Sequence, residues 1–202
     1  MPTTKGHITV NDVTNWGRLL EPFDPYDVKW RANHAGIRRF ASKQDEPWCL
    51  VVPYIRSTAC QERLDEVFGT SGWQTDVRDV SLKDGQPGFI CRLSVYDEVR
   101  EEWIHKEDGA PGTHIESFKG GVSDAFKRVC ASGYGIGRYL RYLPKVIFAQ
   151  AQWGKGDGWE KAQVKDKEAG EFKTYYWYID GGAVLQPWAL PGGSGKPEIV
   201  NH

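Results

Sequence analysis

Three consecutive segments of alternating apolar and polar residues, followed by a segment with helical periodicity, constrain the fold of this chain more than any other feature. Residues 73–80, 89–96 and 99–107 alternate with a period of two, and short turn sequences separate them. This pattern predicts a three-stranded antiparallel meander with one apolar face. The side chains expected on that face are Trp73, Thr75, Val77, Phe89, Cys91, Leu93 and Val95, whereas Arg92 and Ser94 are expected to face solvent.

The segment after the meander predicts an amphipathic helix that covers this apolar face. The sequence DGAPG is expected to end the sheet, and Thr113 with Glu116 forms a capping-box pattern. Apolar residues then recur at helical spacing, at Phe118, Val122, Ala125, Phe126 and Val129. Thr58 and Gln61 form a similar box before a shorter helix that ends at Gly69.

Together these segments predict an α+β fold with a β-β-β-α core. A helix at residues 11–20 and a strand at 174–180 are expected to flank this core, and runs at 28–30 and 48–55 predict two further strands. Pro53 favours an edge strand or a strand end for the second run, because proline has no N–H to donate.

The domain organisation follows from a change of composition after Phe148. We expect a main domain over residues 1–147 and a C-terminal extension over residues 148–202. The first part of the extension is rich in Gly, Lys and Glu and is predicted to be mobile, and a disordered tail is expected after its strand.

Charge and cysteine content restrict the classes of function. The formal net charge is -1, so any contact with nucleic acid requires a local basic patch. The four cysteines form no C-x-x-C pair and lie in apolar runs, which predicts reduced core thiols and an intracellular setting. Since no apolar signal segment or membrane-length run occurs, secretion and membrane spanning are not expected.

The glycines of SDAFKRVCASGYGIGRYLRYLPK, residues 123–145, do not form a nucleotide-binding loop. Gly133, Gly135 and Gly137 follow a predicted helix instead of a strand, and Arg138 occupies the next position of the pattern. The later sequence GGSGKP lacks the first glycine and the final Ser or Thr of a phosphate loop. No ATP site is predicted, and no cofactor is expected.

A metal or hydrolytic site is also not predicted. His105, Glu107, Asp108 and His114 occur close together but without a known ligand spacing, and an acidic loop near a turn is the favoured explanation. No G-x-S-x-G sequence and no local Cys–His pair occur. Enzymatic activity is therefore not expected.

A run of cations is the more informative feature of residues 119–145. On the predicted helix, Lys119 and Lys127 lie on one flank of the apolar stripe and Arg128 lies on the other, and Arg138 and Arg141 follow the glycines. Such a local positive field suits phosphates. A solvated helix face with a basic last turn that interacts with the helix dipole explains the same pattern, so both interpretations stay open at this point.

Three longer stretches resemble, in order, the Rad52/Rad22 family of single-strand annealing proteins. They are YIRSTACQERLDEVFGTSGWQ (54–74), CRLSVYDEVREEW (91–103) and SFKGGVSDAFKRVCASGYGIGRYLRYLP (117–144). The resemblance is closest to the bacterial and phage branch of DNA damage response A (DdrA-like) proteins, and it extends from about Trp30 to Pro144.

The resemblance implies an ATP-independent protein that binds single-stranded DNA and anneals complementary strands in DNA repair and recombination, as an oligomeric ring. It implies DNA-binding roles for Lys127 and Arg128, which match a Lys-Arg pair of the family, and for Lys119, which matches a basic position on the same helix. Arg56 is the nearest cation to a further basic position of the family, near Ala59 in this chain. For Arg138 and Arg141 the choice between DNA and a neighbouring subunit stays open.

Two alternative functions stay open, and the sequence also suggests partners. A module that binds nucleic-acid ends without annealing is the first alternative, and a metal-dependent nuclease that uses His105 and His114 is the second. Tyr134, Tyr139 and Tyr142 either stack on bases or pack against protein. The expected partners are single-stranded DNA and further copies of the chain, with a recombinase or single-strand binding protein as candidates and no membrane. The expected location is the cytoplasm of a bacterial or phage-infected cell, at the nucleoid.

Overall fold

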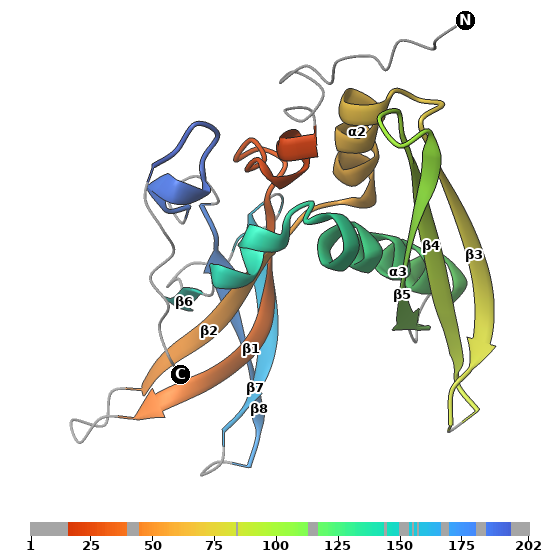
Figure 1. The fold of residues 1–202 in the computed structure, drawn as a ribbon. Helices are drawn as coiled ribbons and strands as arrows, with labels where there is room; N and C mark the ends of the chain where they lie inside the picture. Colours follow the sequence, from red (N-terminus) through yellow and green to blue (C-terminus); the bar gives the residue numbers. More distant parts are fainter. Residues whose placement is uncertain are drawn as a thin grey trace, which may run out of the picture. The chain divides into compact units, whose positions relative to one another are not determined.

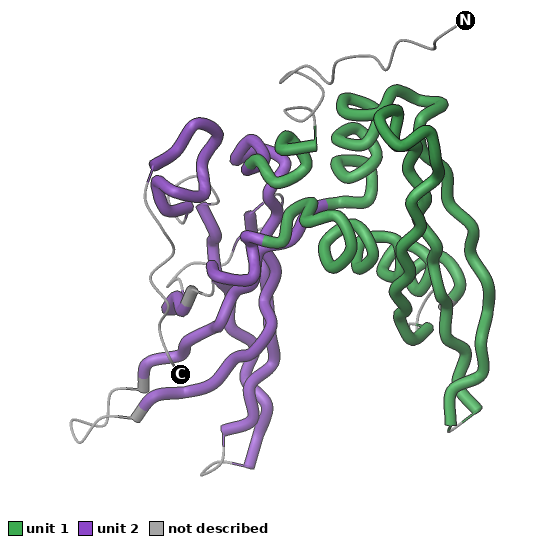
Figure 2. Tube along the Cα trace, in the orientation of Figure 1, with its two compact units in different colours: residues 1–21, 56–138 green, residues 22–55, 139–202 purple. Residues whose placement is uncertain are grey.

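The computed structural model describes residues 16–39, 45–83, 85–112, 117–143, 145–149, 154, 156, 158–166, 170–180 and 185–194. The chain divides into two compact units that interleave along the sequence (Figure 2). Unit 1 comprises residues 1–21 and 56–138, and unit 2 comprises residues 22–55 and 139–202. Helices occur together with antiparallel strands, which confirms the predicted α+β class.

Unit 1 contains an antiparallel sheet and two longer helices (Figure 1). Its elements are η1 (Arg18–Leu20), α2 (Ser57–Phe68), β3 (Trp73–Ser81), β4 (Pro87–Asp97), β5 (Glu102–Pro111) and α3 (Ser117–Tyr134). The strands pair in the order β3-β4-β5, and each is antiparallel to the next. Of the helix predicted at residues 11–20, the structure describes residues 16–20, which are helical.

Helix α3 lies along one face of this sheet (Figure 1). Fully buried side chains from β4 and α3 fill the space between them, namely Leu93, Val95, Val129 and Cys130. The rings of Trp73 and Phe126 lie 6.2 Å apart at one end of this contact. At Gly121 a Cβ atom would clash with the ring of Phe89, so the helix approaches the sheet closely because this position has no side chain.

The turns of the sheet differ from the predicted ones. The N–H groups of Val99 and Arg100 donate to the Asp97 side chain over 3.0 and 3.1 Å, and this turn delays the start of β5 to Glu102. The prediction that DGAPG ends the sheet is wrong, because β4 extends equally far and pairs with β5 as far as Pro111.

The strand register gives β3 and β4 the predicted side-chain directions, but the apolar face is buried on β4 and largely exposed on β3. The four apolar β4 residues expected to face inward are buried. Ser94, expected to face solvent, is buried because His105 on β5 lies over it, with Nδ1 2.8 Å from the Ser94 Oγ. Most of β3 is exposed, Thr75 and Val77 included, since α3 contacts chiefly β4 and β5.

The start of α2 does not depend on its predicted capping box. Helix α2 begins two residues earlier than expected, with Arg56 instead of Thr58 at its N-cap and no side-chain cap, so Thr58 and Gln61 do not form the box. The second predicted box, at Thr113 and Glu116, lies outside the described residues.

Unit 2 is built mainly from strands. Its elements are β1 (Lys29–Arg39), β2 (Asp45–Tyr54), β6 (Lys145–Phe148), β7 (Trp159–Lys165), β8 (Phe172–Tyr178) and η3 (Pro187–Ala189), while η2 (Arg138–Tyr142) begins at the last residue of unit 1. The first sheet has the order β1-β2-β6, so β2 is central and not an edge strand. Pro53 lies near the end of β2, as predicted, and beyond the segment Trp48–Val51 that pairs with β6.

The hairpin of β7 and β8 covers one face of this sheet. Val164 and Trp177 are buried on its inner side. Glu160 accepts a hydrogen bond from the Ala32 N–H over 3.4 Å, at a bulge in β1, and its charge acts on Cys49. Strand β7 was not predicted from the sequence, whereas β8 overlaps the strand expected at residues 174–180.

The cysteines test the prediction of core thiols, and the helices can be compared with the length and apolarity that a membrane span requires. All four cysteines are free thiols and buried, which confirms the predicted core thiols. Burial raises the pKa of both Cys49 and Cys91 to about 11, so these thiols stay protonated near neutral pH. Among the described residues, no helix is both long and apolar enough to span a membrane.

Candidate nucleic-acid interface

The glycine-rich sequence after Cys130 forms the C-terminal cap of α3. Gly135 has a left-handed φ of 84°, and the Ile136 N–H donates to the Cys130 carbonyl over 3.1 Å. The Arg138 guanidinium donates to the carbonyls of Ala131 and Ser132, both over 2.7 Å. These are carbonyls of the last turn, where a cation also interacts favourably with the helix dipole. The glycines therefore form a helix cap and not a phosphate loop. Arg138 contributes to this cap through its bonds to the last-turn carbonyls.

Lys127 and Arg128 lie on opposite flanks of the exposed side of α3. Lys127 forms an ion pair with Asp124, one turn earlier, with 2.8 Å between Nζ and Oδ1. Arg128 reaches the other way, to Asp108 on β5, with 3.3 Å between Nε and Oδ1. The Arg128 side chain is 60% exposed and that of Lys127 is 30% exposed. Both cations therefore have access to solvent, and each is already held by a carboxylate.

Asp108 is the anchor on the β5 side of α3. Its carboxylate accepts hydrogen bonds from the Ser132 hydroxyl and the Gly109 N–H, both over 2.7 Å, besides its contact with Arg128. Partial burial acts to raise the pKa of Asp108, but these hydrogen bonds and the Arg128 charge outweigh it and lower the pKa. The carboxylate thus stays ionised and fixes the position of Arg128.

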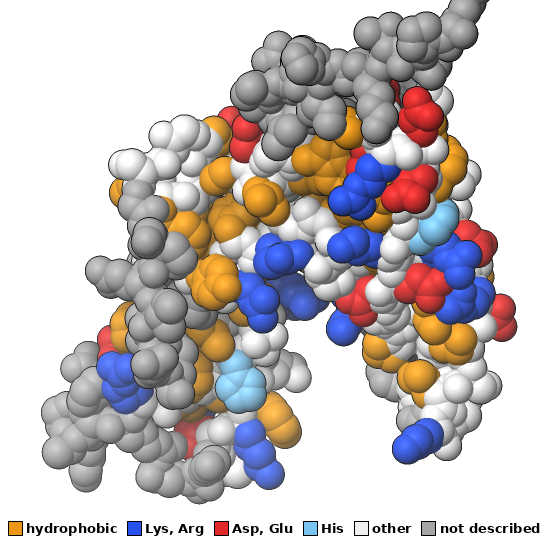
Figure 3. Space-filling view, in the orientation of Figure 1, with side chains coloured by type: hydrophobic (Ala, Val, Ile, Leu, Met, Phe, Trp, Pro, Cys, Tyr) orange, Lys and Arg blue, Asp and Glu red, His pale blue; other side chains and the backbone are white. Residues whose placement is uncertain are grey.

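The other predicted DNA-binding residues lie at different places. Lys119 is exposed near the start of α3, and Arg56 is exposed at the N-cap of α2. Arg141 belongs to the 3-10 helix η2 in unit 2, where its guanidinium lies 5.7 Å from the centroid of the Tyr142 ring. On the side of unit 1 that Figure 3 shows, blue and red side chains are intermixed.

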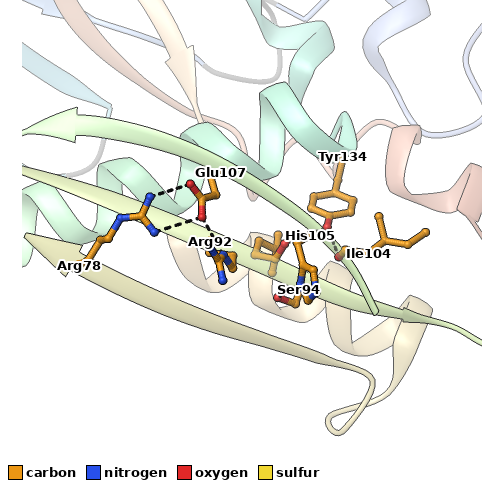
Figure 4. Close-up of polar contacts among 8 residues, drawn as sticks. Arg78, Arg92, Ser94, Ile104, His105, Glu107 and Tyr134 are labelled. Carbon is orange, nitrogen blue, oxygen red and sulfur yellow. Dashed lines mark hydrogen bonds and ion pairs between the residues drawn. The ribbon is translucent and has the colours of Figure 1, made fainter. Parts of the chain in front are cut away.

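The three candidate tyrosines have different environments. The Tyr134 hydroxyl is buried 2.9 Å from the carbonyl oxygens of both Leu93 and Ile104, so this residue packs in the core (Figure 4). Tyr139 accepts a hydrogen bond from the Phe23 N–H over 3.0 Å. Tyr142 is 46% exposed, and its ring is the most accessible of the three for a stacked base.

The other face of the unit 1 sheet carries an ionic cluster (Figure 4). Arg78 and Arg92 donate to the Glu107 carboxylate over 2.8 and 2.7 Å, and these hydrogen bonds lower the pKa of Glu107. His105 lies on the same face, whereas Asp108 is on the face toward α3. The described residues contain no group of three or more His, Cys, Asp or Glu placed to hold a metal ion, and His114 is not among them.

The two carboxylates that hold the cations are the part of this site that the sequence analysis missed. Asp124 precedes Lys127 by three residues, a spacing that brings side chains together on a helix and was visible in the sequence. Asp108 is 20 residues from Arg128, and only the packing of α3 on the sheet brings them into contact.

Comparison with known proteins places this chain among DNA repair proteins. The model of the family "Rad52/22 family double-strand break repair protein" matches residues 14–159, well over half of the chain. A protein named single-stranded DNA-binding protein DdrA from Deinococcus radiodurans is 31% identical over 140 residues, which cover 69% of this chain and 58% of that protein. Its namesake from Deinococcus deserti is 34% identical over 128 residues, covering 63% and 57%. The chain thus spans less than two thirds of the length of these relatives.

A third relative comes from yeast. The DNA repair protein RAD59 of Candida glabrata is 46% identical over 35 residues, which cover 17% of this chain and 16% of that protein. So short a match adds a relative named for DNA repair to the comparison and carries no information on the rest of the chain.

Proposed function

This chain belongs to the Rad52/22 family of double-strand break repair proteins, and we propose that it binds single-stranded DNA and anneals complementary strands during DNA repair. The family match over residues 14–159 carries the proposal. The relatives from two Deinococcus species, both named for single-stranded DNA binding, support it.

The exposed side of α3 is the proposed contact surface for phosphates. Lys127 and Arg128 are exposed enough to reach a backbone, and each is held by a carboxylate that a phosphate can replace. Exchange of one anion for another requires no new cavity. A protein that holds the backbone in this way leaves the base edges free to search for their complements.

The finer features of the function are proposals of the same kind. Annealing uses binding energy alone, so we propose that it proceeds without ATP. One copy of so small a surface contacts few nucleotides, and a ring of copies would supply affinity through many contacts on one strand. We further propose that residues 1–147 contain the DNA-binding domain, that Lys119, Arg56, Arg138 and Arg141 extend the basic surface, and that the protein acts at the nucleoid. A recombinase or single-strand binding protein remains the candidate protein partner.

The salt dependence of binding tests the contact surface. Each phosphate contact with a single strand contributes about 0.7 to the slope of log affinity against log salt concentration. The double variant Lys127→Ala/Arg128→Ala should therefore bind an oligo-dT strand more weakly and with a slope about 1.4 smaller. Arg100→Ala is the matched control, because this arginine is exposed in the β4–β5 turn and pairs with Asp97. An unchanged slope in the double variant would show that α3 does not contact the backbone.

An annealing assay separates annealing from passive binding. Two complementary strands with a fluorescent donor and acceptor should pair faster with the protein than without it, in the absence of ATP. Tight binding without acceleration would instead favour the end-binding module. Native mass spectrometry in the same buffer tests the ring, since a monomer at micromolar concentration with bound DNA contradicts it.

A further inference from the structure

The sheet of unit 2 has a second face, which the hairpin of β7 and β8 does not cover. The face under the hairpin carries Cys49 and Val51, which are fully buried. Side chains alternate along a strand, so their neighbours on β2 point to the opposite side. The strand register then defines that opposite face, here called the platform face, by Arg31, His34, Gly36, Arg38, Glu46, Trp48, Leu50, Val52, Tyr54, Val146 and Phe148.

Cations on the platform face lie over aromatic rings. The Arg31 guanidinium is 5.9 Å from the centroid of the Tyr54 ring, and that of Arg38 is 5.4 Å from the centroid of Phe148. Arg31, His34 and Arg38 are all exposed. Within the described part of the chain, neither arginine forms an ion pair. The guanidinium groups are thus oriented by rings and not neutralised by carboxylates.

Trp48 lies across the middle of the platform face. A Cβ atom at Gly36, its partner on β1, would stand 2.7 to 2.9 Å from three atoms of the indole. The indole therefore occupies the space above Gly36 that a side chain would take. Its ring centroid is 6.4 Å from that of His34. Trp48 remains partly exposed, so a broad aromatic surface is held against the sheet by a glycine.

We propose that the platform face binds single-stranded DNA by stacking bases on Trp48 and Phe148, with Arg31 and Arg38 at the phosphates. Aromatic side chains interleaved with cations are the features by which proteins hold single strands without reading their sequence. Stacking occupies the face of a base and leaves its pairing edge free, as annealing requires. This proposal rests on the proposed function and adds to it a second contact surface, in the unit that does not contain α3.

The charges of the platform face disfavour a symmetric dimer in which two copies of this chain meet through that face. Such a contact would bring two copies of this face together, so that Arg31, His34 and Arg38 of both copies share one interface with Glu46 of each copy as the opposing carboxylate. A polyanion has the complementary charge. Figure 3 shows blue, pale-blue and orange side chains close together on unit 2.

The first test compares an oligo-dT strand with an abasic strand of equal length. Trp48→Ala should weaken binding to oligo-dT by roughly fivefold to a hundredfold, the range for loss of one stacked base, and should change binding to the abasic strand less than about twofold. Trp103→Ala is the control, because Trp103 is an exposed tryptophan that packs on Tyr96 in unit 1. Equal weakening for both strands, or none for either, overturns the proposal.

Two further variants keep the test independent of any effect of Trp48→Ala on folding. Gly36→Ala retains every ring and charge but forces the indole from its place, so it should weaken binding to oligo-dT and not to the abasic strand. Arg31→Ala/Arg38→Ala should lower the salt slope by about 1.4 on either strand.

The outcomes distinguish the two proposals. If the unaltered protein binds neither strand, the proposed function fails. If it binds and all three variants behave like it, only the platform face is excluded. A change in native mass, with equal loss of binding to both strands, would identify the face as a contact between copies and overturn its assignment to DNA.

Discussion

The exposed side of α3 and the platform face of unit 2 both carry cations, but the cations are held in different ways. On α3, Lys127 and Arg128 each contact a carboxylate, at 2.8 and 3.3 Å. On the platform face, Arg31 and Arg38 lie over rings, at 5.9 and 5.4 Å from the ring centroids. A phosphate that bound at the first surface would displace a carboxylate, whereas at the second it would meet a guanidinium that lies over a ring.

If both proposals hold, this difference implies different tasks for the two surfaces. Cations paired with carboxylates contribute little net charge at long range, and they exchange partners when a phosphate arrives. Cations over rings provide both net charge and a stacking surface. We therefore expect α3 to respond to salt and to the removal of its carboxylates, and the platform face to respond to the presence of bases.

The largest expected effect concerns the core that supports the platform face. Trp177 of β8 is fully buried on the inner side of the hairpin, whereas its neighbour Tyr178 is 48% exposed. Trp177→Ala should lower the free energy of unfolding by about 3–5 kcal/mol, measured by urea denaturation, and Tyr178→Ala should lower it much less. In hydrogen exchange, amides of β1 and β2 should lose protection while those of α3 keep theirs. Equal effects of the two variants would show that the hairpin does not stabilise unit 2.

An intermediate effect is expected when a carboxylate is removed from α3. Asp124→Asn removes the partner of Lys127, so a phosphate no longer competes with it. Binding to oligo-dT should strengthen by up to about fivefold, which corresponds to roughly 1 kcal/mol for an exposed ion pair. Glu98→Gln makes the same charge change in the exposed β4–β5 turn and serves as the control. If both variants strengthen binding equally, the gain comes from net charge and the comparison of the two surfaces loses its basis.

The smallest expected effect is a pH dependence of stability that arises from Asp108. Its pKa in the folded protein is lowered below the ordinary value of 3.8, so its contribution to stability is fully present above that value. The contribution should disappear as pH falls through the lowered pKa, because folding then requires the ionised form that acid removes. The difference in unfolding free energy between the unaltered protein and Asp108→Asn should therefore be constant from pH 7 to about 5 and shrink in stronger acid. A difference that grows in acid would contradict the assignment.

Local patterns predicted much of unit 1. The period of two placed β4 and its buried residues correctly, because hydrophobic alternation is a property of the strand itself. The helical period located α3, and glycines marked its end. The sequence pattern gave wrong predictions where contacts between strands decided the outcome. DGAPG continues β5 because β4 is long enough to pair with it. Ser94 is buried because His105 lies over it.

Unit 2 was much less predictable. Its sheet joins β1 and β2 to β6, which lies about 90 residues further along the chain, and no local period reports a pairing over that separation. Strand β7 was assigned to a mobile segment, because Gly, Lys and Glu dominate the sequence around it. The Gly36–Trp48 contact also required the register of β1 on β2.

The sequence by itself determined which segments form strands and helices in unit 1, that its thiols are reduced, and that a family-like Lys-Arg pair lies on α3. These properties depend on residues within a few positions of one another. Only the tertiary structure decided what Arg128 and Arg38 contact, because Asp108 and Phe148 reach them through pairing and packing between distant segments. It therefore also decided where positive charge is neutralised and where it remains available to a phosphate.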